Sequence, residues 1–391
     1  MKDNFFQKNK HAIITYAITL FLLLAIITAI LPHFEGDEII YQSLGIKLAS
    51  FQSYNLHNTE VLKYLPREIY NTSLFFRPPA FMVYLAILYI LMGNIGLHLS
   101  PVIIFILLCI VVYKTTLIIT KSQNSALKAF LLSSVSSLLL FSSLQIHLDL
   151  FMTLMVALSF YCIILFRESN KNKYVFLSGL FLGLAVLTKY SSVILYPFYL
   201  LFLLYKSPKN KLFYCLLFLF PSLIVVIWLF NVIFVNHMTI SSLFSSPNHD
   251  ELIKFPFINY VYRRPFYFYF LDIFIINPLY FFIFLLFRKK IWSRLRSRYG
   301  YFIYFLLSII LTIFIAFTIF GISGGTYQMR FILIAEPFLI ILLSLIPFEE
   351  FTILWNLFWV FAIYNFLLVL YNVIHNNPEL YSFFDKILFQ R

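Results

Sequence analysis

The sequence predicts an all-α polytopic membrane protein. Of its 391 residues, 62% are hydrophobic and only 12% are charged, and the mean hydropathy of +0.89 lies far above that of soluble domains. Long apolar runs alternate with short basic clusters, which is the pattern of membrane-spanning helices and the loops between them. These loop clusters account for the formal net charge of +13 without nucleic-acid binding.

The first element is an apolar run over residues 11–31, preceded by Lys2, Lys8 and Lys10. A run of about twenty residues is longer than the apolar region of a secretory signal and can cross the hydrocarbon core. No convincing small-x-small cleavage site follows it. We therefore expect an uncleaved first span with a cytoplasmic amino terminus.

Further apolar runs predict the later spans. They cover residues 99–119, 127–144, 150–166, 174–188, 190–205, 212–235, 266–287, 301–320, 331–346 and 352–373. The chain is then a single transmembrane domain over residues 1–373 with about eleven spanning helices, a long first outer loop at 32–98, and a short outer tail at 374–391. Cys109, Cys162 and Cys215 lie inside the runs, so neither a disulfide framework nor a CxxC metal site is expected.

The segment Ala80–Met92 is too short to be a span. Bounded by Pro79 and Gly93, its apolar residues cover roughly 20 Å of a ~30 Å core, so we expect an interfacial or re-entrant helix. If this segment does not cross the bilayer, every later basic cluster lies on the cytoplasmic side. If it does cross, the same clusters all face outward, against the positive-inside rule. The clusters are Lys114/Lys121/Lys128, Arg167/Lys171/Lys173, Lys206/Lys209/Lys211 and the run from Arg288 to Arg298.

Acidic residues then gather on the outer side. Asp37 and Glu38 follow Gly36 just after the first span, where a carboxylate can deprotonate an acceptor hydroxyl or amine or help to hold a divalent cation. The alternative is a solvated loop start. Asp149 lies with His147 between two apolar runs, where an ionised side chain is costly unless it faces a polar cavity or a partner. We expect Asp149 to face a polar site.

Cations on the same side indicate an anionic ligand. Arg77, Lys189 and Arg330 lie at the ends of apolar runs, and arginine suits bidentate phosphate recognition, while Pro78-Pro79 would fix the backbone that presents Arg77. A plain interfacial anchor is the alternative for each.

The outer loop over residues 236–265 adds further candidates. We expect Arg263 and Arg264 to contact phosphate, and His249 to line a substrate pocket with His147 and Tyr41. The Asn-His-Asp-Glu string around His249 lacks the i, i+4 spacing of a helical zinc site, so any metal remains unknown. The role of Asp272, an intramembrane carboxylate, is not assigned.

No nucleotide motif is present. The chain has no Walker loop, no dinucleotide fingerprint and no serine-nucleophile elbow. A lipid-phosphate sugar donor suits the outer residues better, because cations would hold the departing phosphate while a carboxylate activates the acceptor.

Several segments together resemble a known family. They are Gly36-Asp37-Glu38-x-x-Tyr41, Arg77-Pro78-Pro79, Leu148-Asp149-Leu150, Gly179-x-x-x-Gly183-Leu184-Ala185-x-Leu187-Thr188-Lys189 and Tyr327-Gln328-Met329-Arg330-Phe331-x-Leu333-x-x-Glu336-Pro337-Phe338. In order and spacing they resemble the integral-membrane glycosyltransferases of the C superfamily, in the branch with protein O-mannosyltransferases and the aminoarabinose transferases of lipid A.

The resemblance implies a polyprenyl-phosphate sugar donor and inverting transfer on the outer face. It implies Asp37 as the catalytic base, Glu38 and Asp149 as supporting acids, and Arg77, Lys189 and Arg330 as donor-phosphate contacts. Phe76 stands where the aminoarabinose branch has an acidic residue, so metal dependence does not carry over, and the only cofactor left open is a divalent cation. The chain also stops soon after Val373, so we expect no large outer carboxyl-terminal domain.

A transporter or flippase of lipid-linked glycans is the alternative, since intramembrane charges also mark substrate pathways. That function predicts polar residues in both halves of the bilayer and an internal repeat. The chain has no clear repeat and its charges crowd to one side, which favours transfer to a cell-envelope lipid, glycan or protein. The expected location is a bacterial cytoplasmic membrane.

Overall fold

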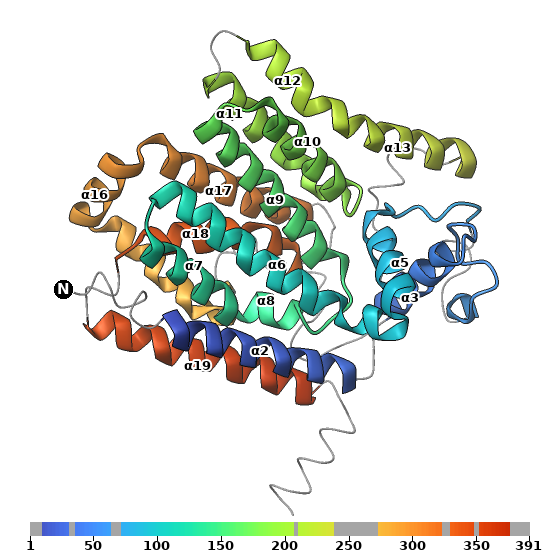
Figure 1. Ribbon diagram of the computed structural model, residues 1–391, viewed down its shortest axis with the longest axis horizontal. Helices are drawn as coiled ribbons and strands as arrows, with labels where there is room; N and C mark the ends of the chain where they lie inside the picture. Colours follow the sequence, from blue (N-terminus) through green and yellow to red (C-terminus); the bar gives the residue numbers. More distant parts are fainter. Residues whose placement is uncertain are drawn as a thin grey trace, which may run out of the picture.

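The computed structural model describes residues 10–30, 36–63, 72–206, 210–237, 273–322, 329–347 and 352–375. These residues form helices and turns without a strand, which confirms the all-α prediction. Figure 1 shows the helices as one bundle, with α2 (Lys10–Ile30) and α19 (Thr352–His375) along one edge and α12 (Lys211–Leu219) and α13 (Leu223–Asn236) along the opposite edge. The central helix α9 (Leu148–Ser169) packs against α6 (Asn94–Thr120) and α10 (Asn172–Val186).

Six helical segments of the described chain are long and apolar enough to cross a bilayer. They are α2, α6, α9, the pair α12 (Lys211–Leu219) and α13 (Leu223–Asn236) joined by η3 (Phe220–Ser222), α17 (Tyr301–Ile322) and α19. The multi-pass prediction is thereby confirmed, whereas the count of about eleven spans is not. Several of the other expected spans are short or interrupted.

The interrupted helices are α7 (Gln123–Val135) followed by α8 (Ser137–Ser142), η2 (Tyr190–Leu195) followed by α11 (Tyr196–Lys206), and η5 (Met329–Ala335) followed by α18 (Glu336–Leu345). The expected span 266–287 is a helical turn at 273–276 and the 3₁₀ helix η4 (Pro278–Phe287), its first residues lying outside the described chain. Pro278 and Pro221 remove backbone donors at two of the breaks.

A buried polar group joins three of these breaks, and we call it the helix-break cluster: Ser136, Asn277, Tyr280, Glu336 and Asn365. The Glu336 carboxylate accepts from the Ser136 hydroxyl at 3.2 Å and from the Tyr280 hydroxyl. Asn277 Nδ2 donates to Ser136 Oγ at 3.2 Å, and Asn365 Nδ2 donates to Asn277 Oδ1 at 2.8 Å. A membrane interior offers little water to the backbone of a broken helix, and here Asn365 Nδ2 donates to the Val135 carbonyl at the end of α7 at 2.9 Å.

The short helix α5 has the predicted bounds, Ala80–Met92. Gly93, with φ of +63°, turns the chain directly from α5 into α6, a conformation that favours glycine. Helix α5 packs on α3 (Gly36–Ala49), and it buries Phe81 and Leu85 while Ile87 and Leu91 stay exposed. Its 13 residues are short of a span, so the interfacial or re-entrant placement stays a prediction.

Helix α10 approaches η3 and α12 closely at one glycine. A Cβ added to Gly179 would lie 1.9 Å from the Phe218 carbonyl oxygen, so only glycine fits there. One turn later, a Cβ on Gly183 would lie 3.4 Å from Ser222 Cα, an ordinary contact. This small-residue packing is typical of helix pairs in membranes.

Candidate active site

The first two acidic residues of the site open helix α3. Asp37 and Glu38 lie in its first turn, where a carboxylate is favoured by the helix dipole. Glu38 is 3% exposed, and its Oε1 accepts a hydrogen bond from the backbone nitrogen of Ile146 at 3.0 Å. Asp37 instead meets Arg77, with 3.2 Å between Oδ1 and Nη1. The adjacent carboxylates therefore have different partners.

Arg77 contacts two groups of α3. Its Nη1 donates to Asp37 and also to the Tyr41 hydroxyl at 2.5 Å, and its Cζ lies 5.6 Å from the centroid of the Tyr41 ring. The Tyr41 ring is buried beside Phe81, at 5.7 Å between centroids. Tyr41 therefore orients the guanidinium from a packed position, and its place in a substrate pocket stays a prediction.

Two distant tyrosines hold the backbone around Arg77. The Tyr54 hydroxyl donates to the Arg77 carbonyl at 3.0 Å, and the Tyr190 hydroxyl donates to the Phe76 carbonyl at 3.2 Å. Trp228 Nε1 donates to the Tyr190 hydroxyl at 3.2 Å. Burial raises the pKa of Tyr54 well above its ordinary value, so its hydroxyl keeps its proton and remains a donor at neutral pH.

The second acid–cation pair lies where α9 begins and the chain leaves α10. Lys189 Nζ lies 2.6 Å from Asp149 Oδ1, and it also lies 4.1 Å from the centroid of the Phe331 ring. The Asp149 side chain is 3% exposed and the Lys189 side chain 25% exposed. Asp149 thus faces a cation, which offsets the cost of an ionised side chain in an apolar environment.

Short contacts connect the two pairs. The Ala80 backbone nitrogen, three residues after Arg77, donates to the Leu187 carbonyl at 2.9 Å, two residues before Lys189. The Tyr41 and His147 rings approach edge to face at 6.5 Å between centroids. Both pairs therefore lie at one end of the bundle, which we call the site end, and which contains α3 and α5 in Figure 1.

Exposure separates the site residues into two groups. Arg77 and Asp37 have side chains that are 25% and 24% exposed, similar to Lys189, so a ligand can reach all three. Glu38, Asp149 and His147 are buried. The accessible atoms are thus two cations and one carboxylate, a set that can hold an anion next to a base.

The remaining predicted residues are not placed by the structure. His249, Arg263 and Arg264 lie outside the described residues, as does Asp272. Arg330 belongs to η5, but its side chain is not described, although the ring of the next residue, Phe331, lies against Lys189. Their roles stay predictions. Within the described chain, no group of three His, Cys, Asp or Glu side chains is arranged to hold a metal ion.

Sequence reasoning missed the aromatic frame of Tyr54, Tyr190, Trp228 and Phe331. Tyr54 packs edge to face on Trp228 at 5.6 Å between ring centroids, across 174 positions of sequence. No local signal marks Tyr54, Tyr190 or Trp228 in a chain with 27 Tyr and 49 Phe, and Phe331 stands in a family-like segment only as the neighbour of Arg330. Their common feature, contact with a segment that carries Arg77 or Lys189, exists only in three dimensions.

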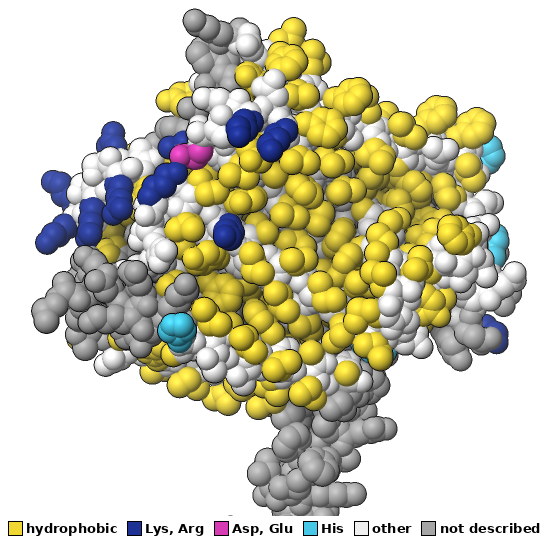
Figure 2. Space-filling model, viewed as in Figure 1, with side chains coloured by type: hydrophobic (Ala, Val, Ile, Leu, Met, Phe, Trp, Pro, Cys, Tyr) yellow, Lys and Arg dark blue, Asp and Glu magenta, His cyan; other side chains and the backbone are white. Residues whose placement is uncertain are grey.

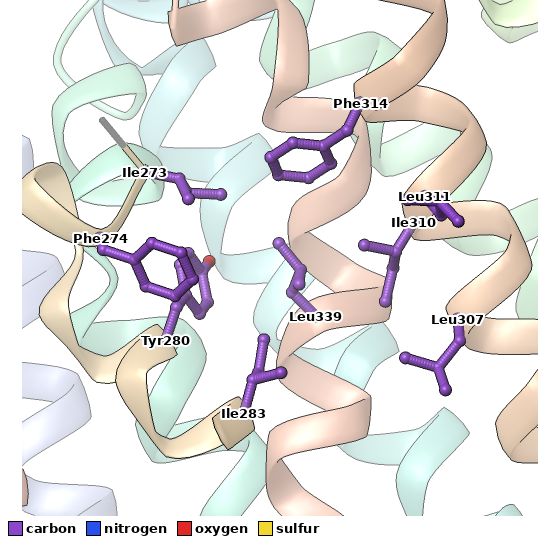
Figure 3. A pocket seen from close by; sticks show the side chains of 9 residues that line it. All are labelled: Ile273, Phe274, Tyr280, Ile283, Leu307, Ile310, Leu311, Phe314 and Leu339. Atoms are coloured by element: carbon purple, nitrogen blue, oxygen red, sulfur yellow. The ribbon is translucent and has the colours of Figure 1, made fainter. Parts of the chain in front are cut away.

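The cavity drawn in Figure 3 is separate from the charged pairs. It has a volume of about 370 Å³ and is bounded by residues 273–274, η4, α17 and α18. Apart from Tyr280 its lining is entirely Ile, Leu and Phe. An apolar cavity of this kind offers no group for acid–base or phosphate chemistry, so the charged pairs remain the candidate site.

The fold and the site define a polytopic helical membrane protein with paired acids and cations at one end. Residues 76–230 match the family model of dolichyl-phosphate-mannose-protein mannosyltransferases. None of the curated proteins matches the sequence.

Solved structures share the fold. ArnT from Cupriavidus metallidurans bound to undecaprenyl phosphate is similar with a TM-score of 0.61 at 16% identity, over 85% of this chain and 59% of that one. Its apo state gives 0.60 at 17% identity, over 84% and 59%. The archaeal oligosaccharyltransferase AglB from Archaeoglobus fulgidus, in complex with an inhibitory peptide and a dolichol-phosphate, gives 0.52 at 14%, over 96% and 56%.

The chain therefore spans a little over half the length of the proteins whose fold it shares. The family match over residues 76–230 and the shared fold agree with the resemblance that the motifs suggested.

Proposed function

We propose that this protein is an inverting glycosyltransferase that moves a sugar from a polyprenyl-phosphate donor to a cell-envelope acceptor. The observation that carries the proposal is the pairing of an accessible carboxylate, Asp37, with an accessible cation, Arg77, beside the Asp149–Lys189 pair. Relatives in fold support the donor class, since ArnT was solved with undecaprenyl phosphate and AglB with a dolichol-phosphate.

In the proposed reaction, Arg77 and Lys189 bind the donor phosphate. The phosphate competes with the carboxylates for these cations, and Asp37 becomes able to take the proton of an acceptor hydroxyl or amine. The acceptor atom bonds to the anomeric carbon as the bond from that carbon to the phosphate oxygen breaks. The polyprenyl phosphate departs with the electron pair, and its charge is held by the guanidinium and the ammonium.

Glu38 and Asp149 have indirect roles in this proposal. Both side chains are 3% or less exposed, and Glu38 accepts a hydrogen bond from the backbone of Ile146. Glu38 holds the start of α9 against α3, and Asp149 sets the position of Lys189. We assign transfer to the outer face, as the distribution of basic loops predicts.

The test uses purified protein in nanodiscs and a radiolabelled polyprenyl-phosphate sugar. Wild-type protein should release polyprenyl phosphate and transfer the label to acceptor or water, whereas flipping without covalent change would identify a transporter. Asp37→Asn should lower the rate by about 10²–10⁴-fold, the usual contribution of a general base. Glu168→Gln is the matched control, because this acid pairs with Lys121 on an exposed surface. A fully active Asp37→Asn protein would contradict the assignment of the base.

A further inference from the structure

The end of the bundle opposite the site end carries a basic amphipathic helix. Asp149 lies in the first turn of α9 and Arg167 in its last, so the helix separates them by about 27 Å. Arg167 Cζ lies 5.9 Å from the centroid of Phe302, near the start of α17. Helix α16 (Lys289–Tyr299) immediately precedes α17, which places it at this opposite end, the basic end (Figure 1).

Helix α16 is fixed to the bundle by its apolar side. Ile291 is 6% exposed and Leu295 is 3% exposed, and the helix contacts both η4 and α17. The Trp292 ring packs edge to face on Tyr304 at 5.6 Å between centroids. Gly300, with φ of +53°, then turns the chain into α17. The helix is thus an anchored element at the end of a candidate span and not a free tail.

The rest of α16 is strongly cationic. Residues 288–300 contain no acidic residue, and their six cations are all exposed: Arg288, Lys289, Lys290, Arg294, Arg296 and Arg298. Lys171 and Lys173 are also exposed at this end, and of the acidic residues described, only Glu168 lies here, bonded to Lys121 at 2.6 Å. Figure 2 shows these Lys and Arg side chains gathered at one end of a broad hydrophobic face.

We propose that α16 is a binding surface for anionic phospholipid headgroups. Because α17 is a candidate span, its first residues lie at a bilayer surface, and headgroup phosphates are the anions present at that depth. Arg side chains bind phosphate oxygens bidentately and Lys side chains bind them as point charges, while Trp292 is of the residue type enriched at membrane interfaces. Each Lys or Arg near an anionic membrane surface strengthens binding to that surface by about fivefold.

Trp292 provides a native reporter for the test. The full-length protein is reconstituted in vesicles of equal phosphatidylglycerol and phosphatidylcholine, with bromine on the acyl chains of one lipid or the other. The difference in fluorescence quenching between wild type and Trp292→Phe isolates the signal of this residue. Brominated phosphatidylglycerol should quench Trp292 several-fold more than brominated phosphatidylcholine does, and soluble glycerol phosphate should not compete.

Two variants with equal charge changes decide the assignment. Changing Lys289, Lys290, Arg296 and Arg298 to Gln should abolish the preference for phosphatidylglycerol. The control changes Lys114, Lys121, Lys171 and Lys173 to Gln and should keep it. Equal quenching by both lipids in wild type, or a preference that survives in the α16 variant, overturns the proposal. Loss of the preference in both variants also overturns the proposal, because general charge attraction then explains the result. Competition by glycerol phosphate, or by an acidic peptide at equal charge concentration, overturns it as well.

Discussion

The Asp149–Lys189 pair allows a quantitative test, because its two members differ in burial. The carboxylate is 3% exposed, whereas the lysine side chain is 25% exposed and keeps the Phe331 ring at 4.1 Å. Lys189→Met removes the ammonium from a carboxylate that water does not reach. Asp149→Asn leaves an ammonium that can still turn to solvent or donate a hydrogen bond to the amide oxygen. Lys189→Met should therefore lower the free energy of unfolding more than Asp149→Asn does.

The magnitudes follow from this asymmetry. Removing the cation from a buried carboxylate costs about 3–5 kcal/mol, and Lys189→Met should fall near the lower limit because Asp149 keeps the favourable position in the first turn of α9. Asp149→Asn replaces a charged hydrogen bond by a neutral one and should cost about 1–2 kcal/mol. The double variant should cost about 2–3 kcal/mol, less than the sum of the single variants, which gives a coupling of roughly 1–3 kcal/mol.

The assay is reversible unfolding of each variant in mixed detergent micelles, followed by the loss of tertiary fluorescence. Wild type, both single variants and the double variant complete the cycle, and Lys121→Met serves as a control for loss of an exposed lysine, since its side chain is 66% exposed. That control should change the free energy of unfolding by less than about 1 kcal/mol. Additive single effects within about 0.5 kcal/mol, or a larger cost for Asp149→Asn than for Lys189→Met, would refute the reasoning.

Three further predictions follow from the site and its frame. Arg77→Lys keeps the charge but loses the planar guanidinium, whose Nη1 donates to both Asp37 and Tyr41 and whose fork can bind phosphate through two bonds, so the rate of sugar release should fall at least about tenfold while the protein stays folded by thermal melting. Gly179→Ala should destabilise the protein by about 1–3 kcal/mol or prevent its expression because of the clash with the Phe218 carbonyl, whereas Gly183→Ala should be nearly neutral, and equal melting temperatures would contradict the packing. The raised pKa of Tyr54 favours its neutral form in the folded protein, so this residue does not lower the free energy of unfolding below about pH 10. Above that pH the free energy of unfolding falls, because the phenol ionises in the unfolded chain. Tyr54→Phe should make near-ultraviolet circular dichroism less sensitive between pH 9 and pH 11, and an unchanged pH dependence would exclude this residue as a cause.

Local signals determined which parts of the fold were predictable. The bounds of α5 follow from Pro79 and Gly93, which end a helix by their own backbone chemistry. The break between α7 and α8 at Ser136 carries no comparable signal, because its stabilising contact is with Glu336, 200 positions away. Apolar composition therefore predicts a continuous helix there, and the buried carboxylate that permits the break is visible only after folding.

The residues of the candidate site also divide into those that local sequence signals predict and those that they do not. Asp37, Arg77, Asp149 and Lys189 are charged residues in an apolar chain, so each is conspicuous, and the structure pairs them. The tyrosines that hold the backbone of Arg77 are ordinary members of an aromatic-rich composition. The residues of the outer loop, His249, Arg263 and Arg264, remain predictions of the sequence alone.

In the first turn of α3, one acidic residue fixes the orientation of the helix and its neighbour meets the cation. Successive residues of an α-helix are rotated by about 100° around the axis, so Glu38 and Asp37 point in different directions. The helix cannot rotate without breaking the bond from Ile146 to Glu38. An anion that draws Arg77 away from Asp37 leaves that second bond intact. Asp37 can then change its electrostatic surroundings at constant geometry, so a ligand can alter the basicity of this carboxylate without moving it.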